Sequence, residues 1–187
     1  MTDIKDARIL ILATNGFEQL ELTVPRDELR KAGAKVEVAS PEGKPIRGWN
    51  KVDWGEMVTS DLKIADAKPD DYQALVLPGG QINPDILRIN PDAMKVVKTF
   101  LDSGKPVAAI CHAPWLLVQA DAVRGLSLTS YKSIRKDVEN AGGKWVDKEV
   151  VVDKGIITSR SPDDLKAFVP KIIEEVREGR HQQRKAA

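Results

Sequence analysis

The stretch VAAICHAPW, residues 107–115, holds Cys111, the only cysteine of this 187-residue chain, directly followed by His112, one of two histidines. A cysteine beside a histidine suggests nucleophilic catalysis, because a thiolate is a strong nucleophile and imidazole can accept the thiol proton. The alternative is a small buried thiol without a chemical role, which is the usual state of a cysteine in an α/β protein. The residues around Cys111 in the sequence favour the first interpretation, a reactive cysteine.

Cys111 lies where an apolar segment, residues 106–110, gives way to a helical pattern that begins at His112. A thiol at a helix N-terminus is close to the positive end of the helix dipole and to free backbone N–H groups, and both favour the thiolate. A tight strand–turn–helix also lifts a side chain out of the sheet, as in the nucleophile elbow of hydrolases. The position therefore predicts a reactive cysteine.

Two further segments could complete a site around the thiol. PGG, residues 78–80, follows an apolar run; Gly79 and Gly80 would let backbone N–H groups approach a reacting oxygen, and the amide of His112 would be the second donor. FEQLEL, residues 17–22, places Glu18 and Glu21 near the start of a helix. Both could be solvated carboxylates, but one that lies next to a thiolate would share a proton with it and have a raised pKa.

The imidazole of His112 needs an acidic partner to orient it if the ring is to act as an acid or base. Neighbouring residues on an elbow point in different directions, so we do not expect a direct bond between this ring and the thiol. Asp85, in NPDIL, could supply the acid from this chain or from a second copy. The alternative is that Asp85 only caps a helix.

Strand-like and helix-like patterns alternate along the chain, which predicts an α/β fold with a mostly parallel sheet flanked by helices. In such sheets the reactive site lies beyond the carboxyl ends of the strands, where the three segments above are found. Residues 41–57, rich in Gly, Pro and Trp, predict a loop with a short hairpin. The expected strands are 8–13, 35–40, 74–77, 106–110, 127–130, 150–152 and 156–158; the expected helices are 17–32, 93–103, 112–121, 134–141 and 161–179.

Length and composition indicate a single domain, 1–187, with a core of about residues 8–179 and a polar, frayed tail at 180–187 in which His181 has no role. A net charge of +1 argues against nucleic acid as a specific partner, and no apolar run is long enough for a membrane span or a signal peptide. One cysteine allows no internal disulfide and suggests a cytoplasmic location. One cysteine and two histidines also make a metal centre unexpected, and no cofactor is expected.

The motifs together resemble the PfpI family of the class I glutamine amidotransferase-like superfamily. The resemblance rests on FEQLELTVPRDELRKAG, ALVLPGG, GKPVAAICHAPWLL and VVVDKGIITSRSPDDLKAF, and it extends from Ile9 to about Ile173. It implies a flavodoxin-like three-layer α/β sandwich with a nucleophile elbow after a central strand. It also implies a homodimer or larger homo-oligomer with the site near the interface.

The resemblance also implies roles for individual residues. Cys111 corresponds to the reactive cysteine, His112 to the histidine after it, and Glu21 to the glutamate that hydrogen-bonds the thiol. The amides of Gly80 and His112 correspond to the oxyanion donors, and Asp85 to an acidic residue that in some members reaches a neighbouring subunit's histidine. Two departures stand out: Ala113 replaces the usual glycine after Cys-His, and the segment QIN before Asp85 is one residue longer.

The activities described for the family differ, so the resemblance suggests a site more firmly than a substrate. The leading hypothesis is a cysteine-dependent hydrolase, of deglycase or glyoxalase type, that protects against stress by acting on small dicarbonyls or their adducts. The enzymatic alternative is an intracellular cysteine peptidase that uses Cys111, His112 and Asp85. The non-enzymatic alternative is a redox-sensing or chaperone-like general stress protein, in which an exposed, acidic thiolate is oxidised and Glu21 stabilises the sulfinate.

Overall fold

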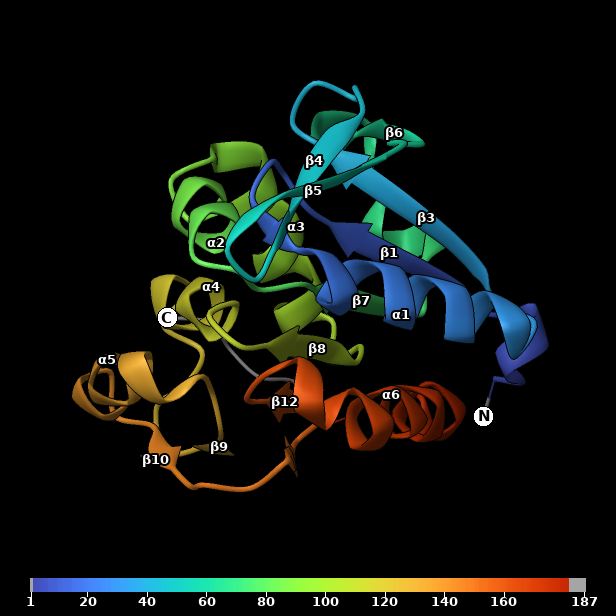
Figure 1. Cartoon of the computed structure of the whole chain (residues 1–187). Coiled ribbons are helices and arrows are strands. Elements are labelled where there is room, and N and C mark those ends of the chain that lie inside the picture. The colour runs from blue at the N-terminus through green and yellow to red at the C-terminus, as the bar shows by residue number, and fades with distance from the viewer. Residues whose placement is uncertain (1, 182–187) are drawn as a thin grey trace.

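The computed structural model describes residues 2–181, which are organised around a seven-stranded sheet (Figure 1). The strand order is β11-β12-β8-β7-β1-β3-β6, and every neighbouring pair is parallel except β11 and β12. The strands of this sheet are β1 (Arg8–Leu12), β3 (Lys35–Ser40), β6 (Leu62–Lys63), β7 (Ala74–Leu77), β8 (Val107–Ile110), β11 (Val150–Asp153) and β12 (Ile156–Ser159). The predicted α/β class with a mostly parallel sheet is confirmed.

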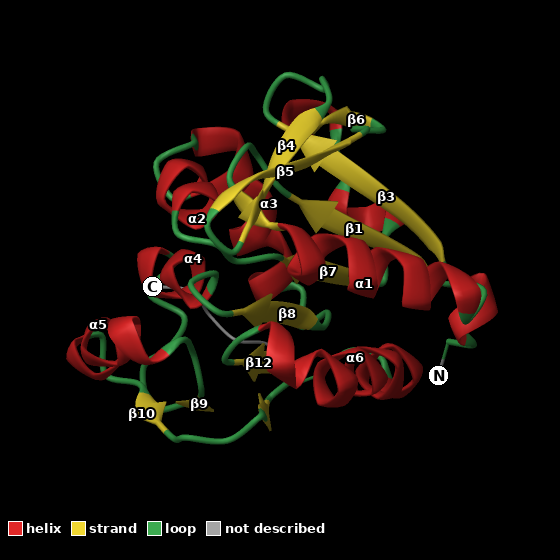
Figure 2. Cartoon of the chain, viewed as in Figure 1, coloured by secondary structure: helices red, strands yellow, loops and turns green. Residues whose placement is uncertain are grey.

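Helices cover both faces of the sheet, as Figure 2 shows with helices in red and strands in yellow. In β1, Ile9 and Ile11 belong to the hydrophobic cluster on one face, while Leu10 and Leu12 belong to the cluster on the other. This alternation follows from the two-residue period of a strand, and both sets are apolar because both faces are covered. The helices are α1 (Gln19–Lys31), α2 (Ile82–Leu87), α3 (Pro91–Asp102), α4 (Pro114–Gln119), α5 (Arg135–Asn140) and α6 (Leu165–Glu178).

The helices divide into two layers according to the cluster that they join. Buried residues of α1 and α6, such as Leu22 and Phe168, pack with Ile9 and Ile11. Buried residues of α3 and α4, such as Phe100 and Leu117, belong to the cluster on the opposite face. The result is a three-layer arrangement in which the loops after β1, β7 and β8 meet at one edge of the sheet (Figure 1).

Two small sheets are attached to this framework. The predicted hairpin within residues 41–57 is confirmed: β4 (Ile46–Asn50) and β5 (Asp53–Val58) are antiparallel, and β4 also pairs with β2 (Phe17–Glu18). The second sheet pairs β9 (Ser127–Leu128) with β10 (Lys144–Trp145) in parallel. Among the described residues, no helix is long and apolar enough to cross a lipid bilayer.

Several predicted boundaries were wrong at helix ends. Pro25 lies buried in the middle of α1, which begins at Gln19 and not at residue 17. Proline has no N–H, so the carbonyl of Glu21 one turn earlier cannot receive the usual helical hydrogen bond. The helix expected from Ser161 begins as a 3₁₀ turn, and Ser161 makes no capping hydrogen bond with its side chain. α4 begins at Pro114, not at His112.

The end of the chain also differs from the prediction of a frayed tail. His181 donates a backbone hydrogen bond to the carbonyl of Gly104 at 2.9 Å, and its ring lies 2.7 Å from a carboxylate oxygen of Glu175. These contacts hold His181 against the body of the protein. The rest of the predicted tail, 182–187, lies outside the described residues.

Candidate active site

Cys111 lies on a strained turn between β8 and α4. Its φ of 64° is in the left-handed region, which residues other than glycine rarely adopt. Backbone hydrogen bonds fix the turn on both sides: the Cys111 N–H donates to Ser159 at 3.0 Å, and the Cys111 carbonyl accepts from the N–H of Tyr131 at 2.8 Å. This is the geometry expected of a nucleophile elbow.

Glu21 is fully buried in the first turn of α1, with its carboxyl next to the Cys111 thiol. Its Oε2 accepts a hydrogen bond from the N–H of Gly79 at 2.9 Å, while Oε1 has no hydrogen-bond partner of good geometry among the described residues. Burial, and then the nearby charge of Glu18, raise the pKa of Glu21 to about 8. Glu21 therefore holds its proton at neutral pH and is a neutral acid beside the sulfur.

The thiol itself is buried, with 7% of the residue exposed. Burial is the main factor that raises the pKa of Cys111, and the charge of an ionised Glu21 adds to it; the amides of Gly80 and His112 act in the opposite direction. The predicted exposed and acidic thiolate was therefore wrong. The helix expected to stabilise it begins only at Pro114 and is short, so its dipole contributes less than expected. At neutral pH the thiol and the neighbouring carboxyl therefore each hold a proton.

The two glycines after β7 have different positions relative to the sulfur. The amide of Gly80 points to Cys111, as does the amide of His112, so these two N–H groups could receive an oxyanion. Gly80 has a φ of +79°, and a Cβ there would approach the carbonyl oxygen of Gly16 to 2.5 Å, so no other residue fits without a backbone shift. The N–H of Gly79 instead donates to Glu21, so it is not available to receive an oxyanion as the sequence predicted.

The imidazole of His112 bridges the thiol and a serine. Its Nδ1 lies 3.1 Å from the sulfur of Cys111, and its Nε2 lies 3.0 Å from Oγ of Ser133. The ring stacks on Tyr131, with centroids 4.9 Å apart, and meets the edge of Trp115 at 5.3 Å. Burial lowers the pKa of His112, so the neutral ring can accept a proton. The expectation of no direct contact with the thiol was wrong.

Asp85 does not reach His112 within this chain. It is exposed on α2 and forms an ion pair with Arg88 at 2.5 Å. The guanidinium of Arg88 in turn lies over the ring of Trp115, 4.6 Å from its centroid. Ser133, in the 3₁₀ turn Lys132–Ile134, is therefore the partner of His112 within the chain. It was not predicted, because a single serine 21 residues after His112 belongs to no motif.

The alanine that replaces the family's glycine after Cys-His fits the turn. Ala113 has a φ of −59°, in the right-handed helical region that any residue adopts, and it is fully buried. Its N–H donates to the carbonyl of Ile110 at 3.0 Å. The position therefore needs no glycine.

Asn83 joins the loops that surround the site and was also not predicted. Its Oδ1 accepts from the N–H of Thr14 at 2.8 Å, and its Nδ2 donates to the carbonyls of Pro78 at 2.8 Å and Gly79 at 3.3 Å. The side chain is fully buried. It ties the loop after β1 to the loop that carries the oxyanion glycines, so we infer that it positions Gly80.

We expect Asn83→Ala to lower the free energy of unfolding by about 2–4 kcal/mol, because it removes the side-chain partner of the buried Thr14 N–H and of the Pro78 carbonyl. Urea unfolding followed by circular dichroism would measure this. Asn90→Ala is the matched control: Asn90 caps α3 through one hydrogen bond at its margin, which predicts a loss of about 1 kcal/mol. An Asn83 variant no less stable than the Asn90 variant would contradict the inferred role.

A cysteine on a strained strand-to-helix turn, beside a buried carboxyl and two convergent amides, is characteristic of α/β proteins with a cysteine nucleophile. The DJ-1/PfpI family matches residues 7–175, and the chain belongs to this family. The resemblance drawn from the motifs is confirmed. The fold agrees as well: the crystal structure of Drosophila melanogaster DJ-1beta superposes with a TM-score of 0.82 at 31% identity, covering 92% of this chain and 94% of that one.

Curated relatives match over almost their whole length. "Protein/nucleic acid deglycase 2" of Escherichia coli strain K12 is 47% identical over 164 residues, covering 86% of this chain and 92% of the relative. "Putative cysteine protease YraA" of Bacillus subtilis strain 168 is 43% identical over 162 residues, covering 86% of this chain and 93% of the relative. Related proteins are thus named both as a deglycase and as a putative cysteine protease, which are the two enzymatic hypotheses drawn from the sequence.

Proposed function

We propose that this protein is a cysteine-dependent deglycase, which acts on small dicarbonyls such as methylglyoxal and on their adducts with amino and thiol groups. The observation that carries the proposal is the pair of Cys111 and Glu21: a thiol on an elbow beside a carboxyl whose pKa is about 8. An acid with a pKa near the working pH is suited to donating and accepting protons repeatedly. The similarity to a relative named as a deglycase supports the same function.

In the first step, the sulfur of Cys111 bonds to the aldehyde-derived carbon of the substrate. With an adduct, the bond from that carbon to the amine or thiol breaks, and the leaving group departs with the proton of the Cys111 thiol. With a free dicarbonyl, the proton goes to the carbonyl oxygen. Either route forms a hemithioacetal, and the amides of Gly80 and His112 stabilise the negative charge that develops on its oxygen.

In the second step, the ionised form of Glu21 removes the proton on the carbon attached to sulfur and returns it to the neighbouring carbon, while the hydroxyl proton on the first carbon moves to the carbonyl oxygen of the second. The hemithioacetal becomes the thioester of a 2-hydroxy acid, so one carbon is oxidised while its neighbour is reduced and no external oxidant is needed. Neutral His112 then activates water, which hydrolyses the thioester and restores the thiol. Ser133 orients the ring through its Nε2.

Peptide hydrolysis is the second candidate, and the contact of 3.1 Å between Cys111 and Nδ1 of His112 favours it. It also needs an acid for the ring, and Asp85 pairs with Arg88 in this chain. The acid would then come from a second copy, and three exposed isoleucines beside Asp85 offer an apolar surface for such a contact: Ile82, Ile86 and Ile89. Peptidase activity should therefore appear only in an oligomer. Light scattering would give the oligomeric state of the sample in which peptide cleavage is measured.

A substrate panel tests the proposal directly. We expect the purified protein to consume methylglyoxal, to release the free guanidine and thiol from methylglyoxal adducts of N-acetylarginine and N-acetylcysteine, and to form a 2-hydroxy acid in equal amount. Liquid chromatography would quantify all of these products, with enzyme-free adducts as the control for spontaneous reversal. Cleavage of unfolded protein or peptides, without turnover of the dicarbonyl, would contradict the proposal and favour the peptidase.

A further inference from the structure

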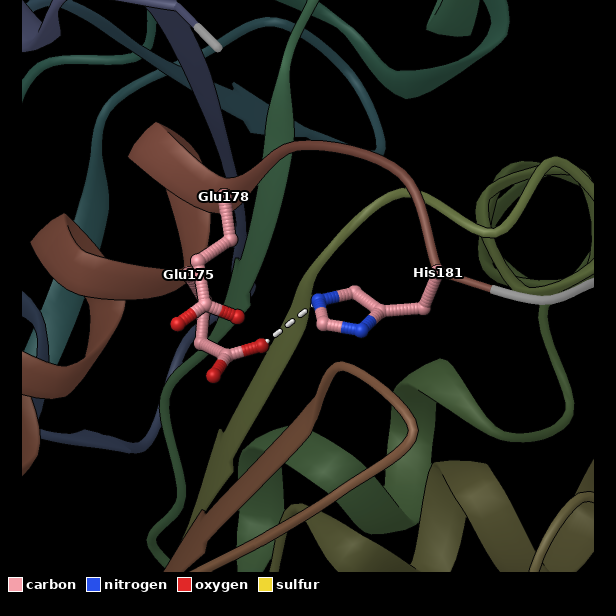
Figure 3. Close-up of side chains that lie close together, drawn as sticks. All are labelled: Glu175, Glu178 and His181. Atoms are coloured by element: carbon pink, nitrogen blue, oxygen red, sulfur yellow. Dashed lines mark ion pairs between the residues drawn. The ribbon is translucent and has the colours of Figure 1, made fainter.

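The C-terminal end of α6 brings together two glutamates and a histidine that lie outside the candidate active site. Glu175 and Glu178 are one turn apart on the same face of the helix, and His181 follows from the segment after it. One potential ligand atom from each of the three lies within 4.8 Å of the others. Figure 3 shows the three side chains converging, with the His181 ring facing the carboxylate of Glu175.

Glu175 is the unusual member of this group, because it is buried with only 4% of the residue exposed. Its Oε2 lies 2.7 Å from Nε2 of His181, yet neither atom makes a hydrogen bond of good geometry with any described residue. The carboxylate of Glu175 thus has only a poorly aligned contact with the imidazole, and the nearby carboxylate of Glu178 adds repulsion. The site therefore has negative charge and unused ligand atoms.

The backbone holds His181 in position. Gly179 ends the helix with a φ of 90°, which turns the chain back toward the sheet. The N–H of His181 then donates to Gly104 at 2.9 Å, and its ring packs against Gly155, where any Cβ would collide with the ring atom Cδ2. The imidazole is thus pre-positioned beside Glu175, and binding a ligand there would cost little ordering entropy.

We propose that Glu175, Glu178 and His181 form a binding site for a divalent transition-metal cation such as Zn²⁺. One imidazole nitrogen and two carboxylate oxygens are a common donor set for such ions, with water completing the coordination. Adjacent ligands of a tetrahedral Zn²⁺ site with bonds of about 2.1 Å lie about 3.4 Å apart, so Oε2 and Nε2, now 2.7 Å apart, need to separate by less than about 1 Å to hold an ion between them. A cation also offsets the charge of the two carboxylates.

The position of the site indicates a structural role. Gly104 and Gly155 precede β8 and β12, whereas Cys111 follows β8, so the cation site and the candidate active site lie at opposite edges of the sheet. A bound ion would fasten the segment after α6 to the start of these two strands. We therefore expect metal binding to raise the melting temperature, since an ion that binds only the folded state stabilises it.

Isothermal titration with ZnCl₂ tests the site, in the full chain carrying Cys111→Ser because a thiolate also binds Zn²⁺. We expect one ion per chain, a dissociation constant of about 10 μM or lower and a higher melting temperature. Glu178→Gln and His181→Gln should each weaken binding at least about 10-fold. Glu174→Gln is the control: Glu174 lies on the same helix but pairs with Lys171 at 2.7 Å, so affinity should not change.

A second readout separates a lost ligand from a lost fold. Circular dichroism must show the same helix content in the variants as in the parent, and NMR should show that Zn²⁺ shifts the ring resonances of His181 but not those of His112. Absence of binding up to about 1 mM Zn²⁺ would overturn the proposal. The contact between His181 and Glu175 would then be only an ion pair that forms when the imidazole is protonated. Unchanged affinity in folded His181→Gln would also overturn it.

Discussion

Replacing Cys111 with alanine is expected to lower the rate of methylglyoxal turnover at least about 1,000-fold, because no other group can form the covalent intermediate. Cys111 is the only cysteine in the chain, so no second thiol can substitute. His112 is neutral and Glu21 is fully buried, and neither can reach the carbonyl carbon as a comparable nucleophile. Initial rates of dicarbonyl loss and 2-hydroxy acid formation would measure the effect.

The control for this experiment is Cys111→Ser, which keeps the size and the hydrogen-bonding capacity of the side chain. A serine hydroxyl is far less acidic than a thiol and is a much weaker nucleophile even beside His112, so we expect a loss of similar size. Both variants should retain the melting temperature to within a few degrees. Alanine and serine experience the same backbone strain at a φ of 64° as the cysteine that they replace. Substantial turnover by either folded variant would exclude the covalent mechanism.

The elements that form the sheet could be predicted because they are encoded locally. Residues 8–13 and 74–77 are continuous apolar runs bounded by turn residues, which is the pattern of a strand buried on both faces. The position of Cys111 between such a run and a helix also predicted the elbow. Glu21 could be selected over Glu18 only through the family motif, because both occur in the same turn of sequence.

The contacts that orient the site depend on distant residues and could not be predicted. Ser133 reaches His112 only because the Tyr131 N–H bonds to the Cys111 carbonyl and places the loop that follows next to the elbow. Asn83 likewise accepts a hydrogen bond from the N–H of Thr14, which is 69 residues earlier in the sequence. The polar composition of the C-terminus predicted a frayed tail, and for His181 this prediction was wrong. His181 packs against Gly104 and Gly155, which are far from it in the sequence, so the sequence alone does not indicate this contact.

Glu21→Gln is expected to lower turnover at least about 100-fold while the protein stays folded. The amide has almost the same shape as the carboxyl, and its oxygen can still accept the hydrogen bond that the Gly79 N–H donates at 2.9 Å. It cannot take up and return a proton, so the step that converts the hemithioacetal to the thioester should become rate-limiting. Turnover within a few-fold of the parent would exclude Glu21 as the group that moves the proton.

The same variant should change how stability depends on pH. Burial raises the pKa of Glu21 from an ordinary value of 4.5 to about 8, so between these values the folded state keeps a proton that the unfolded chain has lost. Because the folded state binds more protons in that window, the free energy of unfolding falls as pH rises through it. At pH below 4.5, both states are protonated and the contribution is constant.

Glutamine does not titrate, so the variant should lack this part of the pH dependence. Between pH 5 and pH 8 we expect the parent to lose roughly 3 kcal/mol more unfolding free energy than Glu21→Gln, given 1.4 kcal/mol per pKa unit. Urea unfolding of both proteins at four pH values gives the difference, and groups common to both cancel. Parallel pH profiles would mean that Glu21 is already ionised in the folded protein over this pH range, and they would contradict the raised pKa of its carboxyl.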